Sequence, residues 1–265
     1  MFIETNKLYC RDNLKLMKDL PSKSIDLIYC DILYGTGRDF GDYKDLPADK
    51  DKIEEFYYPR VREIHRLLKN TGSIYLQMDT RINHWLRVIL DNVFGYNNFR
   101  NEIIWSYRNG GTTDKKFNNK HDNILFYSKT DGYKFNPTKE KSYTKSKSRK
   151  PGIVNYGGKK VKFFKDELGV YTWVKAKDVW NIPYINSQAN ERVDYQTQKP
   201  KKLLERIIKA SSDKGDIVAD FFMGSGTTIV VAEELDRKWI GCDINQKAIN
   251  ITKERLSYLQ KRLFV

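Results

Sequence analysis

The sequence predicts an α/β protein whose mostly parallel β-sheet carries helices on both faces. Three observations lead to this prediction. Short apolar runs alternate with stretches of helical spacing at both ends of the chain, as in parallel sheets. Residues 25–32 are apolar almost throughout, which is typical of a strand buried on both sides. The chain of 265 residues is long enough for one large domain, or for one domain with an inserted lobe.

The first part of the chain continues this alternation. The spacing of apolar side chains predicts a helix over residues 56–69, a strand over 73–78 and a helix over 82–95. Residues 101–107 and 123–128 are predicted to be two further strands. Because no helix separates them, we expect this pair to be antiparallel.

The middle of the chain differs in composition. Between Lys139 and Lys165 there are ten basic residues and one acidic residue, Glu140. Ser, Thr, Tyr and Gly fill the gaps, so we expect an inserted lobe with mobile loops. The sequence therefore predicts a core domain in two parts, 1–130 and 191–265, interrupted by an insert over 131–190.

The alternating pattern returns near Gln198. The predicted elements are a helix, a strand, a glycine turn, a helix, a strand and a final helix, at residues 201–212, 216–222, 223–228, 229–238, 239–244 and 245–263.

Charge and composition narrow the class of partner. A formal net charge of +14 indicates a polyanion, which is DNA, RNA or an acidic membrane face. The sequence has no run as long as a membrane span and no apolar leader, so a cytoplasmic protein is expected. The three cysteines, Cys10, Cys30 and Cys242, are far apart and are expected to be reduced and buried. No spacing of histidines or cysteines indicates a metal site.

The segment "ADFFMGSGTT", residues 219–228, joins a predicted strand to a predicted helix. Gly224 and Gly226 allow a sharp turn and a close approach to a ligand, and Ser225 and Thr227 add hydroxyl groups. Asp243 ends the next strand 19 residues after Gly224, where an acid can reach a ribose. From these residues alone, a dinucleotide, S-adenosylmethionine and a turn without a ligand all remain open.

A second motif, "DILYGTG", follows the apolar run over residues 25–30. It begins with Asp31, and its fourth residue is Tyr34. In a doubly wound sheet the carboxyl ends of the strands meet at one edge. We therefore expect Asp31, Asp220 and Asp243 to converge on one crevice.

In their order along the chain, "DILYGTG", "YQTQKPKKLLERII", "ADFFMGSGTT" and "IGCDI" resemble the β class of amino-methylating DNA methyltransferases. The resemblance implies a class I methyltransferase fold with permuted motif order, S-adenosylmethionine as the donor, and an exocyclic base nitrogen as the acceptor. It also implies double-stranded DNA as the substrate and N6-methyladenine as the product, with N4-methylcytosine as the alternative. Relatives of this class are often dimers or accompany a restriction endonuclease. The sequence alone determines neither the oligomeric state nor the presence of a partner nuclease.

The resemblance implies roles for individual residues. Asp31 and the Ile32 carbonyl would accept the two N–H groups of the target amine, and Tyr34 would stack on a base that has left the duplex. The implied cofactor contacts are Asp12, Lys199, Asp220, Phe222, Gly224, Ser225, Gly226, Thr227, Asp243 and Asn245.

The sequence departs from the family pattern at Ile32 and Leu33, which stand where the family has two prolines. Proline restrains φ, so we expect a less preorganised loop. Phe221 and Gln196 also replace prolines of the pattern. A working enzyme is the prediction, and a catalytically impaired DNA-binding relative is the alternative. A nicotinamide oxidoreductase is a third hypothesis, which Ile229 in the place of a third glycine disfavours.

The basic insert coincides with the family's target-recognition region, and aromatic residues interleave with its lysines. Lysines would contact phosphates, while polar side chains read base edges. The DNA-binding candidates are Arg108, Lys145, Lys147, Arg149 and Lys150.

Overall fold

The protein is described by a computed structural model over residues 3–41, 44–107, 113–146, 148–186, 188–193 and 195–263. The chain forms two compact units. The first comprises Met1–Asn136 and Asp178–Val265, and the second comprises Pro137–Lys177. The second unit is narrower than the insert expected over 131–190, because the flanking residues belong to the first unit. The backbone N–H of Asn136, for example, donates to the carbonyl of Ala210 at 2.6 Å.

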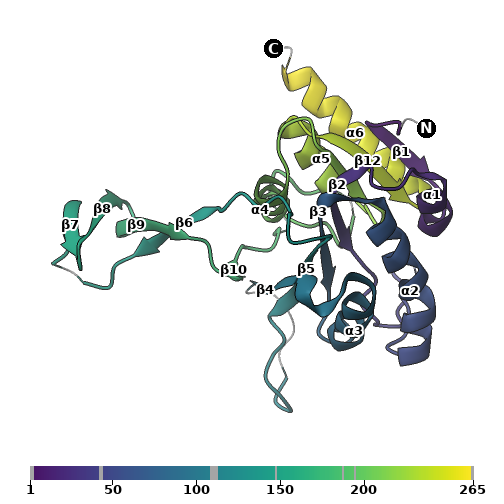
Figure 1. The fold of residues 1–265 in the computed structure, drawn as a ribbon, viewed down its shortest axis with the longest axis horizontal. Coiled ribbons are helices and arrows are strands. Elements are labelled where there is room, and N and C mark those ends of the chain that lie inside the picture. The colour runs from purple at the N-terminus through teal and green to yellow at the C-terminus, as the bar shows by residue number, and fades with distance from the viewer. Residues whose placement is uncertain are drawn as a thin grey trace. The chain divides into compact units, whose positions relative to one another are not determined.

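The first unit is built on one eight-stranded sheet (Figure 1). The strands lie in the order β1-β12-β11-β2-β3-β5-β4-β10. Only β5 runs antiparallel to its neighbours, β3 and β4, which confirms the predicted antiparallel pair. The bounds are β1 (Lys7–Cys10), β2 (Ile25–Asp31), β3 (Leu68–Met78), β4 (Phe99–Ser106), β5 (His121–Ser128), β10 (Val179–Asn181), β11 (Ile217–Asp220) and β12 (Lys238–Asp243).

Helices cover both faces of this sheet, as predicted. Two separate apolar clusters follow from the alternation of side chains along the strands. One cluster joins the sheet to α1 (Asn13–Asp19), α2 (Lys50–Leu67) and α3 (Asn83–Phe94). The other joins it to α4 (Lys201–Ser211), α5 (Thr227–Glu234) and α6 (Gln246–Leu263). A short 3-10 helix, η1 (Tyr96–Asn98), follows α3.

Strand β2 lies in the middle of the sheet and positions the "DILYGTG" motif. Its first six residues are buried. Ile28 and Cys30 belong to the cluster under α1 to α3, while Leu27 and Tyr29 belong to the opposite cluster. Each such apolar side chain contributes roughly 1.5–3 kcal/mol by burial, so the strand fixes where Asp31 emerges.

Two local features differ from expectation. Helix α2 begins six residues before the predicted start at 56, because the Asp49 side chain caps it by accepting from the backbone N–H of Lys52 at 3.0 Å. Cys10 was expected to be buried, and this expectation is wrong. It is exposed because β1 is an edge strand, whereas Cys30 and Cys242 are buried.

The second unit is an antiparallel sheet of four strands in the order β6-β9-β8-β7. The bounds are β6 (Lys139–Tyr143), β7 (Gly152–Tyr156), β8 (Lys159–Asp166) and β9 (Gly169–Lys175). The inserted lobe thus contains a regular antiparallel sheet in addition to loops.

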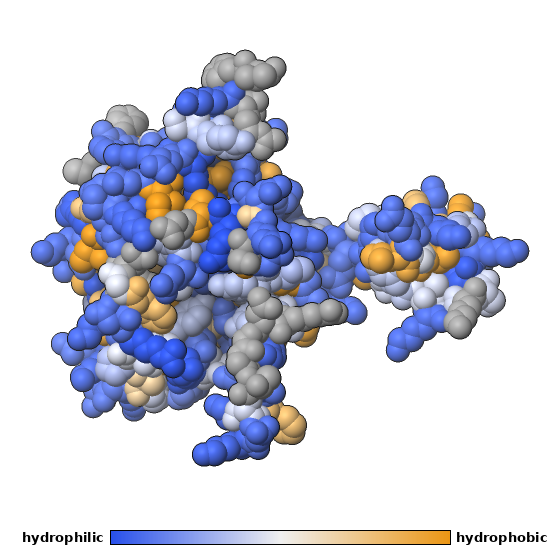
Figure 2. Space-filling model, turned by 180° about the vertical axis from the view of Figure 1, so that it is seen from behind, coloured by the Kyte–Doolittle hydropathy of each residue, from blue (hydrophilic) through white to orange (hydrophobic). Residues whose placement is uncertain are grey.

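The surface seen in Figure 2 is hydrophilic over most of its area, in keeping with a chain that is 31% charged. Among the described residues, no helix combines the length and the apolar character that a membrane crossing requires.

Candidate active site

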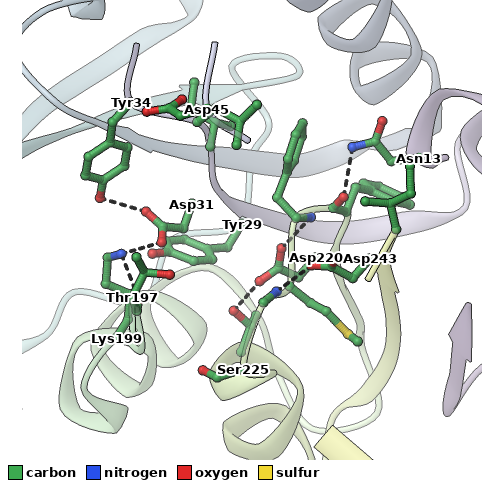
Figure 3. A pocket seen from close by; sticks show the side chains of 18 of the residues that line it. Asn13, Tyr29, Asp31, Tyr34, Asp45, Thr197, Lys199, Asp220, Ser225 and Asp243 are labelled. Atoms are coloured by element: carbon green, nitrogen blue, oxygen red, sulfur yellow. Dashed lines mark hydrogen bonds and ion pairs between the residues drawn. The ribbon is translucent and has the colours of Figure 1, made fainter. Parts of the chain in front are cut away.

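The three acids predicted to converge do lie together, in the first unit. Asp31, Asp220 and Asp243 end β2, β11 and β12, three strands of the parallel part of the sheet. All three line one cavity of about 380 Å³ (Figure 3). This volume falls within the range of small-molecule sites, so the crevice can hold a ligand the size of a nucleoside derivative.

The two glycines of the turn serve different purposes. Gly224 has φ +48° and lines the cavity, and an added Cβ would lie 3.2 Å from a ring carbon of Tyr195. Gly226 has φ +73° and begins α5, but it does not line the cavity. A Cβ at Gly226 would lie 2.2 Å from the hydroxyl of Thr252. Gly224 therefore allows a ligand to approach, whereas Gly226 allows α5 to pack against α6.

Asp243 fixes the shape of the turn. Its Oδ2 accepts from the backbone N–H of Gly224 at 2.9 Å, and its Oδ1 accepts from that of Asn245 at 2.9 Å. Burial raises the pKa of this carboxyl, while the backbone hydrogen bonds oppose the rise. Asn245 itself is not among the residues that line the cavity, because its side chain accepts from the backbone N–H of Lys247 at the start of α6.

Asp220 lines the cavity and is only 2% exposed. It accepts from the backbone N–H of Phe222 at 3.0 Å and from the Thr228 hydroxyl at 2.6 Å. Burial raises the pKa of Asp220 to about 7, and the nearby carboxylates of Asp31 and Asp243 add to the rise. A carboxyl group that titrates near neutrality within a cleft is a common mark of a functional site.

Both oxygens of Asp31 are engaged. Oδ1 accepts from the Tyr34 hydroxyl at 2.8 Å, and Oδ2 forms an ion pair with Lys199 Nζ (Figure 3). Burial raises the pKa of Asp31, whereas Lys199 acts in the opposite direction. The ammonium group of Lys199 thus favours the ionised carboxylate, which is the form that can accept an N–H group.

A polar network extends from Tyr34 towards β3 and β5. The Tyr34 hydroxyl lies 2.8 Å from Asp122 Oδ2, and Gln77 Nε2 donates to the same Oδ2 at 2.9 Å. The Tyr107 hydroxyl donates to Asp122 Oδ1 at 2.8 Å. A single tyrosine proton therefore faces two carboxylates, Asp31 and Asp122, and can satisfy only one of them at a time.

A second cavity, of about 360 Å³, lies beside this network. Three residues, Tyr34, Thr197 and Lys199, line both cavities. The remaining walls of the second cavity are Trp105, Tyr107, Asp122 and Tyr184. Flat rings with a few polar groups suit a planar heterocycle, so the two cavities can hold two reactants next to each other.

The far end of the first cavity is formed by the start of α1. Asp12 caps this helix and pairs with Arg60 Nη2 at 3.1 Å. Asn13 Nδ2 donates to the carbonyl of Phe221 at 3.0 Å, which ties α1 to the glycine turn. The Arg60 guanidinium also stacks over the Phe56 ring at 3.6 Å.

Most of the predicted site residues meet in the first unit. Those that line its larger cavity are Asp12, Asp31, Ile32, Tyr34, Lys199, Asp220, Phe222, Gly224, Ser225, Thr227 and Asp243. Gly226 and Asn245 do not, for the reasons given above. Sequence analysis did not identify four further residues near the site, which are Asn13, Arg60, Thr197 and Asp122. Only Asn13 had a recognisable signal, the helix-capping pattern "RDN".

The DNA-binding candidates lie elsewhere. Lys145 and Lys150 are exposed in the second unit. Arg149 stacks over the Phe163 ring at 5.0 Å, so it stabilises that unit from within. Lys147 and Arg108 lie outside the described residues.

Comparison with known proteins assigns this chain to one family. The profile of the DNA methylase family that modifies N6 and N4 amines matches residues 25–254. The chain is 33% identical over 250 residues to the Type II methyltransferase M.HpaI of Haemophilus parainfluenzae, covering 94% of this chain and 74% of that protein. It is 32% identical over 248 residues to the DNA adenine methyltransferase YhdJ of Escherichia coli K12, covering 92% and 80%.

Solved structures share this fold. The PvuII DNA methyltransferase, described as cytosine-N4-specific, superimposes with a TM-score of 0.67 at 17% identity, covering 95% of this chain and 86% of that one. TTHA0409 of Thermus thermophilus, complexed with S-adenosyl-L-methionine, gives a TM-score of 0.63 at 20% identity, covering 95% and 93%. The chain belongs to the N6/N4 DNA methylase family. Both the resemblance and the predicted fold class are confirmed.

Proposed function

We propose that this protein transfers the methyl group of S-adenosylmethionine to the N6 amine of an adenine that has left the DNA duplex. The observation that carries the proposal is the position of Asp31. Its carboxylate lines the larger cavity with Gly224 and Asp243, and its hydrogen-bond partner Tyr34 lines both cavities. A donor in one cavity and a base in the other would meet at this carboxylate.

The residues of the larger cavity fit the donor. When bound, S-adenosylmethionine supplies a methyl group on a positively charged sulfonium. Asp243 offers a carboxylate for ribose hydroxyls, and Gly224 leaves room for close approach. Asp12 and Asn13 provide polar groups at the other end of the cavity. Asp220 is a buried carboxyl that favours a cationic ligand once it is ionised.

Asp31 would prepare the acceptor. An exocyclic amine on an aromatic base is a poor nucleophile, because its lone pair is delocalised into the ring. A carboxylate that accepts one N–H, with the Ile32 carbonyl accepting the other, favours a tetrahedral nitrogen whose lone pair is available. Lys199 and Tyr34 each engage one Asp31 oxygen. Since each carboxylate oxygen has two lone pairs, the amine can donate to Asp31 beside these partners.

Adenine is favoured over cytosine by two observations. An acid in the first position of the catalytic motif is the family's usual choice for adenine, and one relative that is 32% identical is an adenine methyltransferase by name. N4-methylation of cytosine is the second candidate, because the same family includes it and the PvuII enzyme shares the fold.

The second unit supplies a surface for the DNA. On one face of its sheet, the rings of Tyr143, Phe164 and Trp173 surround Tyr171 at centroid distances of 5.5, 5.6 and 5.8 Å. Lys141 and Lys162 lie over rings of this face. Lysines that meet phosphates beside aromatic rings suit a nucleic acid.

Incubation with tritiated S-adenosylmethionine and mixed-sequence DNA, followed by nucleoside analysis, tests the proposal. The expected label is in N6-methyladenine. Asp31→Ala should lose at least a hundredfold in turnover while binding DNA as before. Asp131→Asn, a surface carboxylate paired with Arg100, is the control and should keep full activity. Label in N4-methylcytosine would exclude adenine as the target. No label from a protein that binds both ligands would show a non-catalytic DNA-binding relative.

A further inference from the structure

The loop between Asp31 and Tyr34 is held by two backbone hydrogen bonds that a proline could not form. Ile32 and Leu33 stand where the family motif has two prolines, so each retains a backbone N–H. The Ile32 N–H donates to the carbonyl of Gln77 on β3 at 3.1 Å. The Leu33 N–H lies 3.1 Å from the hydroxyl of Tyr57, to which it donates. Both backbone N–H groups that are present because these residues are not proline therefore donate hydrogen bonds.

Tyr57 contacts Leu33 at two points. Besides accepting from the Leu33 N–H, its hydroxyl donates to the Leu33 carbonyl at 3.4 Å. The N–H and the C=O of Leu33 belong to consecutive peptide groups, so the contact restrains the backbone on both sides of this residue. Leu33 is next to Tyr34 and two residues from Asp31, and a small rotation of its backbone would displace both side chains.

Close packing around Tyr57 fixes the position of its side chain. The residue is 1% exposed and lies in α2. Its ring packs edge-on against Phe56, with centroids 4.9 Å apart, and lies 6.3 Å from the ring of Phe222. Tyr57 does not itself line either cavity. Both hydrogen bonds that the structure gives its hydroxyl go to Leu33, so the hydroxyl would act on the reaction through the loop.

We propose that Tyr57 is a positioning residue, which holds the Asp31–Tyr34 loop by hydrogen bonds in place of the rigidity that prolines give it elsewhere in the family. The inference rests on the proposed function for its effect on turnover, but the restraint itself is a property of the folded protein. Displacement of a catalytic group by about 1 Å can lower a rate roughly a hundredfold.

The two motif positions are not equivalent under this proposal. Ile32 is 3% exposed in the apolar core, and its N–H extends the β2–β3 pairing. Proline at this position would remove a sheet hydrogen bond and a buried side chain together. Leu33 is less buried. Leu33→Pro removes the N–H that Tyr57 accepts and replaces a side chain that packs at the edge of the core, while the proline ring restrains φ.

A double-mutant cycle tests the proposal. Tyr57→Phe keeps the ring and removes the hydroxyl, and we expect kcat to fall ten- to a hundredfold while the Kd values for S-adenosylmethionine and DNA change less than twofold. Leu33→Pro should keep kcat within about threefold of the wild type. In the Leu33→Pro background, Tyr57→Phe should lower kcat by no more than about threefold. An equal loss in both backgrounds, or no loss in the single variant, would overturn the proposal.

Tyr75→Phe provides the matched control. Tyr75 is also buried, and its hydroxyl bonds to that of Ser211 at 2.8 Å, away from both cavities. Its loss should lower thermal stability without lowering kcat.

Amide hydrogen exchange supplies a readout that does not depend on turnover. The Leu33 amide should exchange at least tenfold faster in Tyr57→Phe than in the wild type or in Tyr75→Phe. Unchanged exchange would refute the restraint. A wild type that transfers no methyl group, with exchange altered as expected, would refute only the proposed function.

Discussion

The buried carboxyl of Asp220 leads to a quantitative prediction about donor binding. Burial raises the pKa of Asp220 to about 7, so the group is mostly neutral at pH 6 and mostly ionised at pH 8. S-adenosylmethionine is cationic at its sulfonium and amino groups, and it should bind the ionised form. If only that form binds, affinity should be about tenfold weaker at pH 6 than at pH 8.

Isothermal titration of S-adenosylmethionine at several pH values measures this effect. At pH 6, two buffers of different ionisation enthalpy should reveal the release of nearly one proton on binding. Asp31 and Asp243 face the same cavity, and burial also raises the pKa of each. Asp220→Asn therefore has to flatten the pH dependence if the assignment is right. A Kd independent of pH in the wild type, or an unchanged slope in Asp220→Asn, would refute the reasoning.

The same group should affect the stability of the free protein. A carboxyl whose pKa in the folded protein exceeds its ordinary value of 3.8 stabilises the fold at low pH, and this contribution is lost as the pH rises towards 7. At about 1.4 kcal/mol for each tenfold change in proton affinity, the upper limit is roughly 4 kcal/mol. Asp220→Asn should thus raise the melting temperature at pH 8 and leave it nearly unchanged at pH 4. A variant that is less stable at pH 8 would contradict this.

Substitutions of Lys199, of Gly226 and of two lysines in the second unit test three further roles. Lys199→Gln removes the positive charge that lowers the pKa of Asp31, so the acid limb of the pH–kcat profile should move to higher pH; an unmoved limb would count against the ion pair. Gly226→Ala should destabilise the fold by about 1–3 kcal/mol in urea unfolding, because of its φ of +73° and the side chain it meets; wild-type stability would contradict the packing role. Replacing Lys145 and Lys150 by Ser should weaken DNA binding equally for all sequences and lower the salt slope by about one for each phosphate that is no longer neutralised; a sequence-dependent effect would indicate base reading instead.

The convergence of the acids could be predicted because it depends on a rule of topology. Strand ends of a parallel sheet share one edge, so "IDLIYCD" and "WIGCD" were sufficient to bring Asp31 and Asp243 together. The partners of these acids could not be predicted in the same way. Asp122 reaches Tyr34 across 88 residues of sequence, and it does so because β5 lies antiparallel beside β3. No local pattern encodes that pairing.

The second unit shows a different limit. Its strands contain an alternation that could have been recognised, since Lys139, Lys141 and Tyr143 occupy one face of β6. Basic residues in place of apolar ones concealed this period of two, so an inserted lobe with mobile loops was expected and its individual strands were not. Tyr57 was missed for another reason. A tyrosine within an amphipathic helix predicts core packing, and only the structure shows which backbone group its hydroxyl contacts.

The distribution of charge explains how one protein can attract both a polyanion and a cation. The chain as a whole carries +14, which attracts DNA over distances comparable to the screening length of about 8 Å in physiological salt. Within the larger cavity, Asp220 and Asp243 accept hydrogen bonds from neutral N–H and O–H donors. These carboxyls lie in a buried, weakly screened environment, where a cation interacts with them strongly and a phosphate is repelled. The net positive charge of the chain thus attracts the nucleic acid, while these two buried carboxyls give the cavity a local affinity for the cationic donor.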